Sequence, residues 1–259
     1  MKKTNYEIIL GTKICTSPQK KILDTVIRRV ENGRQTVIFT PNPQILLKAR
    51  KSKKYGKILN SSTLNLPDGI GIVIASKLCR SKIKERVGGI DFADSLIRFA
   101  EKEGYKIFLL GAKPSVAENA KRNLKKAHPS LLICGTHHGY FKKSGEENDI
   151  VIEKIKDSSP DILFVCLGAP AQEEWITKNK DRLSSVKLFI GLGGSLDVFA
   201  GNARRAPKFI QIIGLEWLYR TIKEPRRARI FWDIPVFLFE ILKSKKGSRS
   251  CESLIFFKY

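Results

Sequence analysis

Short β-rich runs alternate with helical patterns along about the first 200 residues, and this alternation constrains the fold more than any other feature. The predicted strands are TVIFT (36–40), KIFLLGA (106–112), LLICGT (131–136), DILFVCLGA (161–169) and KLFIGLGG (187–194). Helical stretches at 19–33, 91–104 and 115–128 lie between them, and the first two end at Gly33 and Gly104. The pattern predicts an α/β protein with a Rossmann-like, open, mostly parallel sheet and helices on both faces.

Several predicted strands run directly into glycine, at Gly111, Gly168 and the pair Gly193 and Gly194. In an open parallel sheet the carboxyl ends of the strands border the ligand crevice, where glycines let backbone amides approach a phosphate. The glycines therefore favour a nucleotide-type ligand, although tight strand-to-helix turns explain them equally well. Neither the dinucleotide fingerprint GxGxxG nor the phosphate loop GxxxxGK[ST] occurs in the sequence.

The chain is strongly basic, with 48 Lys and Arg against 25 Asp and Glu and a net charge of +23. Such a charge attracts polyanions, which include nucleic acid, an anionic membrane and phosphorylated substrates. The five cysteines are widely spaced and form no CxxC pair, so we expect reduced thiols and a cytoplasmic location. No apolar segment is long enough for a signal peptide or a membrane-spanning helix, and any membrane contact is expected to be peripheral.

The composition changes after Gly201, which predicts a core at 1–201 and a basic, aromatic-rich appendage at 202–259. The appendage holds 13 Lys and Arg against 5 Asp and Glu. Its run FWDIPVFLFEILK (231–243) is flanked by arginines and lysines, as in elements that bury aromatic side chains among lipid headgroups. The alternative is a helix packed on the core with a solvated basic edge.

Polar clusters occur where predicted strands or helices end, and each has an ordinary explanation when taken singly. Thr40 and Asn42 lie beside prolines and suit a turn, while Asp68 and Asp91 suit helix N-caps. Asp68 is equally consistent with a carboxylate held at a cleft as a base. The clusters are TPNPQ (40–44), PDG (67–69) with ERVGGID (85–91), GAPAQEEW (168–175), and RRAP, LEWLYR and EPRR between 204 and 227.

Taken together and in this order, the clusters resemble the WecG/TagA/CpsF family of bacterial glycosyltransferases. The resemblance runs from about Glu7 to Arg229 and rests on T-P-N, P-D-G, R-V-x-G-x-D, G-x-P-x-Q-E-x-W, G-x-G-G-x-x-D, R-A-P and E-W-x-x-R. It implies transfer of an N-acetylmannosamine-type sugar from a UDP donor to undecaprenyl-diphosphate-linked N-acetylglucosamine, which in Gram-positive bacteria makes the linkage unit of wall teichoic acid. N-acetylmannosaminuronic acid, or another UDP-linked sugar for a different envelope polysaccharide, remains an alternative donor.

The resemblance also assigns roles to individual residues. An inverting transfer needs a base that takes the proton of the acceptor hydroxyl, and Asp68 matches the family's proposed base. Thr40 and Asn42 are expected to orient the sugar, with turn formation as the alternative. Guanidinium groups suit the negative charge that develops on the UDP leaving group. The candidates for this task are Arg86 and, in the appendage, Arg220, Arg226 and Arg227.

Other roles concern the nucleotide and the sugar hydroxyls. Asp197 is expected to bind the uridine, and Tyr140 to stack on uracil unless it is half-buried core. Gln172 is a candidate for binding hydroxyls, while Glu173 and Trp175 are expected to cap and anchor a helix. The predicted substrate-binding set also contains Gly69, Asp91, Gly111, Gly168, Gly193 and Gly194. One departure is Ala171, where family members often carry lysine, so a phosphate contact there is in doubt.

The sequence favours a metal-independent mechanism without a cofactor. It contains no Asp-x-Asp motif, and the adjacent His137 and His138 are expected to point to opposite faces of a strand. The resemblance implies a UDP-sugar, a polyprenyl-diphosphate-linked acceptor and an anionic membrane surface as partners, together with self-association. We further hypothesise that the segment from Arg220 to Arg229 closes over the diphosphate only at the membrane.

Two other classes of protein compete with this interpretation. The first is a nucleic-acid-binding α/β protein, which the charge would suit but for which no recognisable motif is present. The second is a non-catalytic membrane scaffold that keeps the fold. We therefore expect no nucleic acid partner and a peripheral protein at the inner face of the cell membrane.

Overall fold

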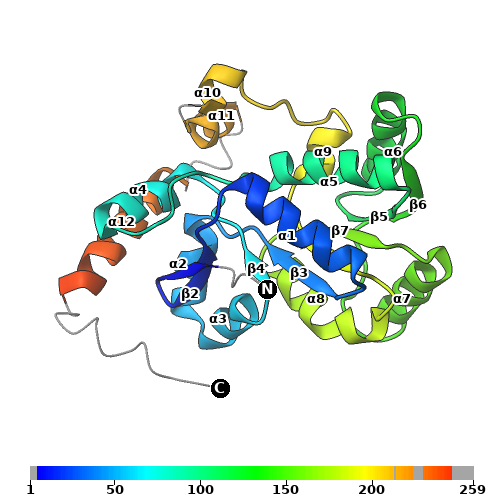
Figure 1. Cartoon of the computed structure of the whole chain (residues 1–259), viewed down its shortest axis with the longest axis horizontal. Helices are drawn as coiled ribbons and strands as arrows, with labels where there is room; N and C mark the ends of the chain where they lie inside the picture. Colours follow the sequence, from blue (N-terminus) through cyan, green and yellow to red (C-terminus); the bar gives the residue numbers. More distant parts are fainter. Residues whose placement is uncertain (1–4, 213, 224–229, 247–259) are drawn as a thin grey trace.

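The computed structural model describes residues 5–212, 214–223 and 230–246 and is built around a six-stranded sheet (Figure 1). The strand order is β4-β3-β8-β7-β5-β6, and every pair of neighbours is parallel. The strands are β3 (Thr36–Phe39), β4 (Leu64–Asn65), β5 (Lys106–Gly111), β6 (Leu132–His137), β7 (Ile162–Cys166) and β8 (Leu188–Gly191). The Rossmann-like α/β prediction is confirmed, and each of the five predicted strands is present.

Helices cover both faces of the sheet because its strands are apolar on both sides. In β7, Phe164 packs into one apolar cluster while its neighbours Leu163 and Val165 pack into the other. On the first face lie α1 (Gln19–Glu31), α5 (Gly89–Glu103), α6 (Val116–Ala127) and α9 (Ser195–Phe199). On the second lie α2 (Pro43–Lys51), α3 (Lys53–Asn60), α7 (Glu146–Ser158), α8 (Ala171–Asn179) and the 3-10 helix η1 (Lys180–Leu183).

A separate antiparallel hairpin precedes this sheet and was not predicted. It consists of β1 (Tyr6–Ile9) and β2 (Thr12–Cys15), joined at Leu10 and Gly11. Each strand has only four residues, and β4 of the main sheet has two, so periodicity gives too little signal. The hairpin buries Ile9 and Ile14 in a third apolar cluster.

This third cluster joins the hairpin to α2, α4 (Ile70–Cys79) and α12 (Ile230–Lys246), which lie together in Figure 1. Phe237 of α12 is fully buried there, whereas Trp232 and Phe239 of the same helix are 74% and 64% exposed. The aromatic run is therefore a helix packed on the core, as the alternative had it, but with exposed aromatic side chains on its outer side. None of the helices within the described ranges is long and apolar enough to cross a membrane.

Two short helices, α10 (Lys208–Ile212) and α11 (Glu216–Lys223), stand between the core and α12 in the chain. The ion pairs of Glu216 with Arg86 and Arg205 connect α11 to the segment before α5 and to the segment before α10. Division of the chain at residues 201 and 202 into a core and an appendage stays a prediction.

Candidate active site

A cavity of about 420 Å³ opens at the carboxyl ends of four neighbouring strands, β3, β4, β7 and β8. This is the edge at which open α/β sheets bind ligands. Eight of the predicted site residues line it: Thr40, Asn42, Asp68, Gly69, Arg86, Gln172, Gly193 and Gly194. The fold therefore brings together side chains and glycines that are spread over about 150 positions of the sequence.

Asp68 follows β4 and is held by the backbone on both sides. Its own N–H donates to the carbonyl of Pro41 at 3.1 Å, and its carboxylate accepts a hydrogen bond from the N–H of Gly89. Helix α4 begins at Ile70 with Gly69 as its N-cap residue, and no described side chain caps it. The helix-cap alternative for Asp68 is therefore wrong.

Burial raises the pKa of Asp68 from the usual 3.8 to about 6. The Arg86 cation and the Gly89 amide oppose this rise in pKa, whereas the carboxylates of Glu216 and Asp91 add to it. A carboxyl group with this pKa is mostly ionised at neutral pH yet more basic than an exposed aspartate. Such a group suits proton abstraction at the wall of a cavity.

Thr40 and Asn42 organise the loop that follows β3. The buried hydroxyl of Thr40 donates to the carbonyl of Gly191 at 2.8 Å and so links the ends of β3 and β8. The Oδ1 atom of Asn42 accepts the N–H of Ile45 at 3.0 Å and caps α2. Asn42 thus has a structural role, as a helix cap and not as the turn former of the alternative, and it also lines the cavity.

Close packing sets the spacing between this loop and Asp68. Gly71, in the first turn of α4, lies against Pro43 at the start of α2. A Cβ atom at position 71 would lie 2.7 Å from Cγ of Pro43, which is too close for two carbon atoms. Glycine is therefore required here for the two helix starts to meet.

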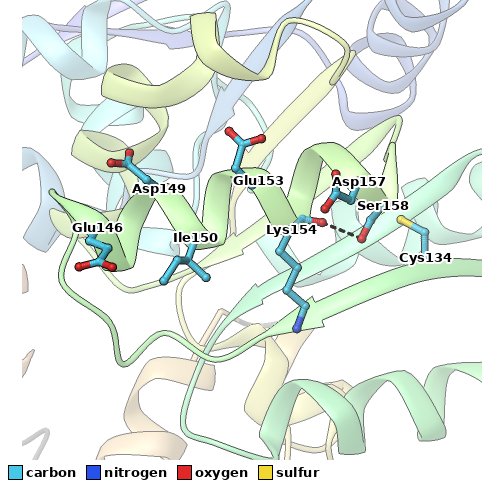
Figure 2. Close-up of a pocket in the computed structure, with 8 residues that line it drawn as sticks. All are labelled: Cys134, Glu146, Asp149, Ile150, Glu153, Lys154, Asp157 and Ser158. Atoms are coloured by element: carbon cyan, nitrogen blue, oxygen red, sulfur yellow. Dashed lines mark hydrogen bonds between the residues drawn. The ribbon is translucent and has the colours of Figure 1, made fainter.

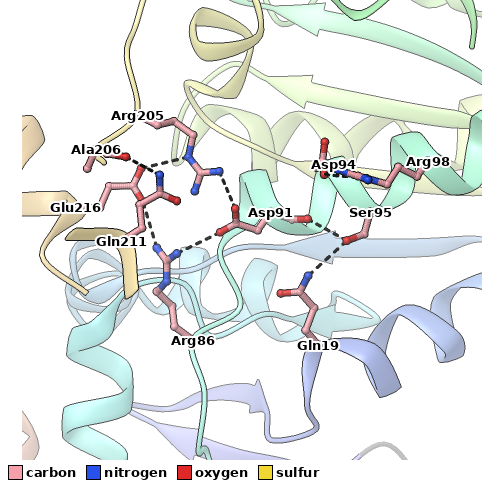
Figure 3. A network of polar contacts seen from close by, with 10 residues as sticks. All are labelled: Gln19, Arg86, Asp91, Asp94, Ser95, Arg98, Arg205, Ala206, Gln211 and Glu216. Carbon is pink, nitrogen blue, oxygen red and sulfur yellow. Dashed lines mark hydrogen bonds and ion pairs between the residues drawn. The ribbon is translucent and has the colours of Figure 1, made fainter. Parts of the chain in front are cut away.

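A network of ion pairs stands beside the cavity (Figure 3). The carboxylate of Asp91 contacts Nη2 of Arg86 at 3.1 Å and Nη1 of Arg205 at 2.7 Å. Glu216 approaches the same two guanidinium groups at 3.4 and 3.7 Å. Asp91 is not an N-cap, since α5 begins at Gly89 and its N-cap residue is Gly88. An anionic ligand of Arg86 would compete with Asp91 and Glu216 for it.

The first turn of α8 differs from its prediction in one respect. Glu173 caps nothing, since no described side chain caps α8, and its carboxylate is buried beside Tyr55 and Gln172. Trp175 does anchor the helix, because its buried indole N–H donates to Oδ1 of Asn148 at 2.7 Å. Gln172 reaches the cavity from this turn.

Five predicted residues do not line the cavity: Asp91, Gly111, Tyr140, Gly168 and Asp197. At Gly111 a Cβ atom would lie 2.3 Å from the carbonyl oxygen of Cys166, so the contact between β5 and β7 itself requires glycine. Tyr140 is 65% exposed, which shows that the half-buried alternative is wrong. Asp197 is partly exposed in α9, where its backbone carbonyl accepts from Asn202.

The three predicted arginines of the last segment cannot be placed in the site. Arg226 and Arg227 lie outside the described residues, and of Arg220 only the backbone, within α11, is described. The prediction that they contact a diphosphate stays a prediction.

The two adjacent histidines do not point apart. His137 ends β6 and His138 follows it, and their ring centroids are 4.5 Å from each other. The expectation of opposite faces was wrong because the strand ends between them. In the described part of the chain, no group of three or more His, Cys, Asp and Glu side chains is arranged to hold a metal ion.

Sequence reasoning missed several residues of the cavity wall. Lys48 comes from α2, Glu216 and Trp217 from α11, and Ile234 from α12. Glu216 and Trp217 stand inside the E-W-x-x-R motif, which was the available signal for them. Nothing in the sequence pattern indicates Lys48 or Ile234, because their position depends on how α2 and α12 pack.

A second groove runs along the exposed side of α7 and shares no lining residue with the first cavity (Figure 2). Its side chains are largely acidic and include none of the predicted site residues. They are Cys134, Glu146, Asp149, Ile150, Glu153, Lys154, Asp157 and Ser158. The convergence of polar motifs at the sheet edge therefore makes the first cavity the candidate active site.

Comparison with known proteins identifies relatives over most of the chain. An N-acetylglucosaminyldiphosphoundecaprenol N-acetyl-beta-D-mannosaminyltransferase of Bacillus subtilis (strain 168) is 37% identical over 214 residues, which cover 83% of this chain and 82% of the relative. The enzyme of the same name from Staphylococcus aureus (strain MW2) is 35% identical over 240 residues, 92% of each chain. The model of the family described as "Glycosyl transferase WecG/TagA/CpsF family" matches residues 8–251 of the chain. The chain therefore belongs to this family of glycosyltransferases.

Proposed function

We propose that this protein is an inverting glycosyltransferase that moves N-acetylmannosamine from UDP-N-acetylmannosamine to undecaprenyl-diphosphate-linked N-acetylglucosamine. The names of relatives at 35–37% identity support the acceptor and the transferred sugar. UDP as the carrier of that sugar follows from the family resemblance. By the resemblance described above, the product would be the linkage-unit disaccharide of wall teichoic acid.

The observation that carries the proposal is the half-buried carboxylate of Asp68 on the cavity wall, with Arg86 close enough to affect its pKa. In the proposed step the acceptor hydroxyl gives its proton to Asp68, and its oxygen forms a bond to the anomeric carbon from the face opposite UDP. The bond between that carbon and the diphosphate oxygen breaks, and UDP leaves with the electron pair. The configuration at the anomeric carbon is inverted.

Of the cations that line the cavity, Arg86 is the one that we assign to the leaving diphosphate. It lines the cavity, and its guanidinium is already held in position by Asp91 and Glu216. Thr40 and Asn42 would face the sugar beside it. Asp197 and Tyr140 remain predicted ligands of the uridine, and Gly111 and Gly168 predicted substrate-binding residues. Since none of the four lines this cavity, the uridine would have to extend beyond it.

A transfer assay with a panel of donors tests this proposal. Purified protein is mixed with a short-chain polyprenyl-diphosphate N-acetylglucosamine and with UDP-linked N-acetylmannosamine, N-acetylmannosaminuronic acid or N-acetylglucosamine. We expect the lipid product to gain one N-acetylhexosamine, seen by mass spectrometry, fastest with the first donor. Preference for the uronic acid would overturn the donor assignment, and no product with any donor would overturn the reaction.

The competing classes of protein predict different results. A nucleic-acid-binding protein would retain DNA or RNA on a filter at physiological salt and release no UDP. A membrane scaffold would bind vesicles but would be indifferent to replacement of Asp68. The assay above is therefore run beside a filter-binding measurement with the same protein.

We also propose that the outer side of α12 contacts an anionic membrane. It exposes Trp232, Val236 and Phe239, at the spacing that places side chains on one helix face, and Lys243 follows them. Replacing Trp232 and Phe239 by serine should weaken sedimentation with phosphatidylglycerol vesicles and leave transfer to a water-soluble acceptor unchanged. Equal sedimentation of the variant would contradict this contact.

The hypothesis that the segment from Arg220 to Arg229 closes over the diphosphate is tested by substitution. Deletion of 202–259 is unsuitable because it would also remove Phe237 and expose the third apolar cluster. Replacing Arg226 and Arg227 by alanine should reduce transfer, and vesicles should stimulate the natural protein more than the variant. Self-association at the membrane face is a separate prediction, which light scattering with and without lipid nanodiscs tests.

A further inference from the structure

Glu173 is a buried carboxylate to which the reaction above gives no task. It is fully buried on α8, where an isolated ionised group would be costly. The hydroxyl of Tyr55, from α3, lies 3.0 Å from its Oε2 atom, and Nε2 of Gln172 donates to its Oε1 atom at 2.8 Å. Burial is the strongest influence and raises the pKa of Glu173 above its usual value. These two hydrogen bonds and the nearby Lys48 oppose that rise without cancelling it.

The contact with Glu173 orients the side-chain amide of Gln172. A backbone N–H can only donate, so the carbonyl oxygen of Gln172 must face the N–H of Gly193 and its NH2 group must face Glu173. That oxygen accepts the backbone N–H of Gly193 at 2.8 Å. The chain of contacts therefore runs from Tyr55 through Glu173 and Gln172 to the backbone of Gly193.

Gly193 belongs to the turn between β8 and α9, which forms part of the cavity wall. The hydroxyl of Thr40 holds this turn at its other end, through the carbonyl of Gly191. The side chain of Gln172 also packs against Gly191, where a Cβ atom would meet Nε2 at 3.0 Å. The turn is thus fixed at one point by β3 and at another by α8.

We propose that Glu173 is a positioning residue. Together with Tyr55 it fixes the side-chain amide of Gln172, and this amide in turn fixes the glycine turn at 191–194, which the donor's diphosphate would face. This inference rests on the proposed function for the identity of the ligand. In this role Glu173 affects the shape of the donor site but does not itself contact the substrate.

The order of donors and acceptors in this chain of contacts gives a sharp test. Gln172→Glu places a second carboxylate against Glu173, and the two must then share a proton. Adding Glu173→Gln restores complementarity with the order reversed: the new glutamine donates to the new glutamate, which still accepts from Gly193. The other charged or titratable groups facing this position are Lys48 and Tyr55 from neighbouring helices and Glu174 on α8.

The measurements are UDP affinity by calorimetry, kcat and KM for the donor between pH 6 and 8.5, and hydrogen exchange of the Gly193 amide. We expect Gln172→Glu to weaken UDP binding more than about tenfold at pH 8 and less at pH 6, with faster exchange at Gly193. The double variant should return to within about threefold of the natural protein. Glu174→Gln, which alters an exposed carboxylate of the same turn, is the matched control and should change none of these values.

Failure of this inference is distinguishable from failure of the proposed function. If the double variant stays as impaired as Gln172→Glu, the positioning role is wrong even though transfer by the natural protein is normal. If the natural protein transfers no sugar, or binds no UDP, the exchange at Gly193 still reports whether the reversed pair restores the turn. Should Gln172→Glu fail to fold, Tyr55→Phe removes one hydrogen bond without changing charge, and unaltered exchange and KM in that variant would contradict the proposal.

Discussion

The two walls of the cavity are held in place in different ways. The sheet wall, formed by Thr40, Asp68, Gln172 and Gly193, is fixed by hydrogen bonds to backbone groups of the core. The helical wall, formed by Glu216, Trp217 and Ile234, is attached through side chains. Among the described residues, its contacts include the ion pairs of Glu216, a hydrogen bond from Gln44 to Asp233 of α12, and the burial of Phe237.

This difference separates two requirements of a transferase that works on a lipid. The reacting groups must be placed accurately before substrate arrives, which backbone hydrogen bonds within a packed core achieve. We expect the helical wall to be the one that admits the bulky acceptor, because contacts between side chains are easier to exchange. The predictions below therefore examine the walls separately.

The largest effect is expected on the sheet wall, from Asp68→Asn. The amide cannot take the acceptor's proton, so kcat should fall by about 10² to 10⁴. UDP affinity, measured by calorimetry, should change little. Asp157→Asn, on the acidic side of α7, is the control and should behave as the natural protein; a loss of turnover below about threefold in Asp68→Asn would remove Asp68 as the base.

The attachment of the helical wall is tested by two identical substitutions on α12. Phe237→Ala opens a cavity in the third apolar cluster and should cost about 3–5 kcal/mol in free energy of unfolding. Phe239→Ala, two positions further on the exposed side, should change it by less than about 0.5 kcal/mol. Denaturant titration measures both, and equal values would show that α12 does not depend on this cluster.

The junction of the walls is Arg86, whose charge acts on Asp68. Since the pKa of Asp68 is about 6, kcat/KM should fall as the pH drops through 6, where the base becomes protonated. Arg86→Gln removes a cation that favours the ionised carboxylate, so this pKa and the acid limb of the profile should move to higher pH. A limb that stays in place would mean that Arg86 does not face Asp68 in the working enzyme.

The smallest effect, on the acid limb of the kcat/KM profile, is expected from the charge of Glu216 on the helical wall. Glu216→Gln removes an anion that raises the pKa of Asp68, and the acid limb of kcat/KM should move to lower pH. Its direction is thus opposite to that of Arg86→Gln. If both variants shift the limb the same way, the effect arises from the shape of the site and not from charge.

The sequence predicted the sheet wall well, for a physical reason. Strands buried on both faces leave continuous apolar runs, and polar motifs directly after such runs must meet at one edge of a parallel sheet. Thr40 and Gln172 follow predicted strands in this way. Asp68 follows β4, which was not predicted, and it was singled out by the P-D-G motif of the family resemblance.

The helical wall was harder to predict from the sequence. Ile234 and Phe237 belong to one aromatic run, and the sequence does not say which of its faces turns toward α2 and α4. Glu173 was misjudged because a glutamate in a first helical turn usually faces solvent and the helix dipole. Its burial depends on Tyr55, which is 118 residues away in the chain.

Gly71 limits how this cavity can change. Any side chain at that position would push Pro43 away and with it the start of α2, so Asn42 and Asp68 would separate. The distance between the loop expected to orient the sugar and the proposed base is therefore not adjustable by single substitutions at this point. We expect a variant with a different acceptor or donor to gain its new preference from cavity side chains such as Trp217, Ile234 or Lys48, which come from helices and not from a strand end.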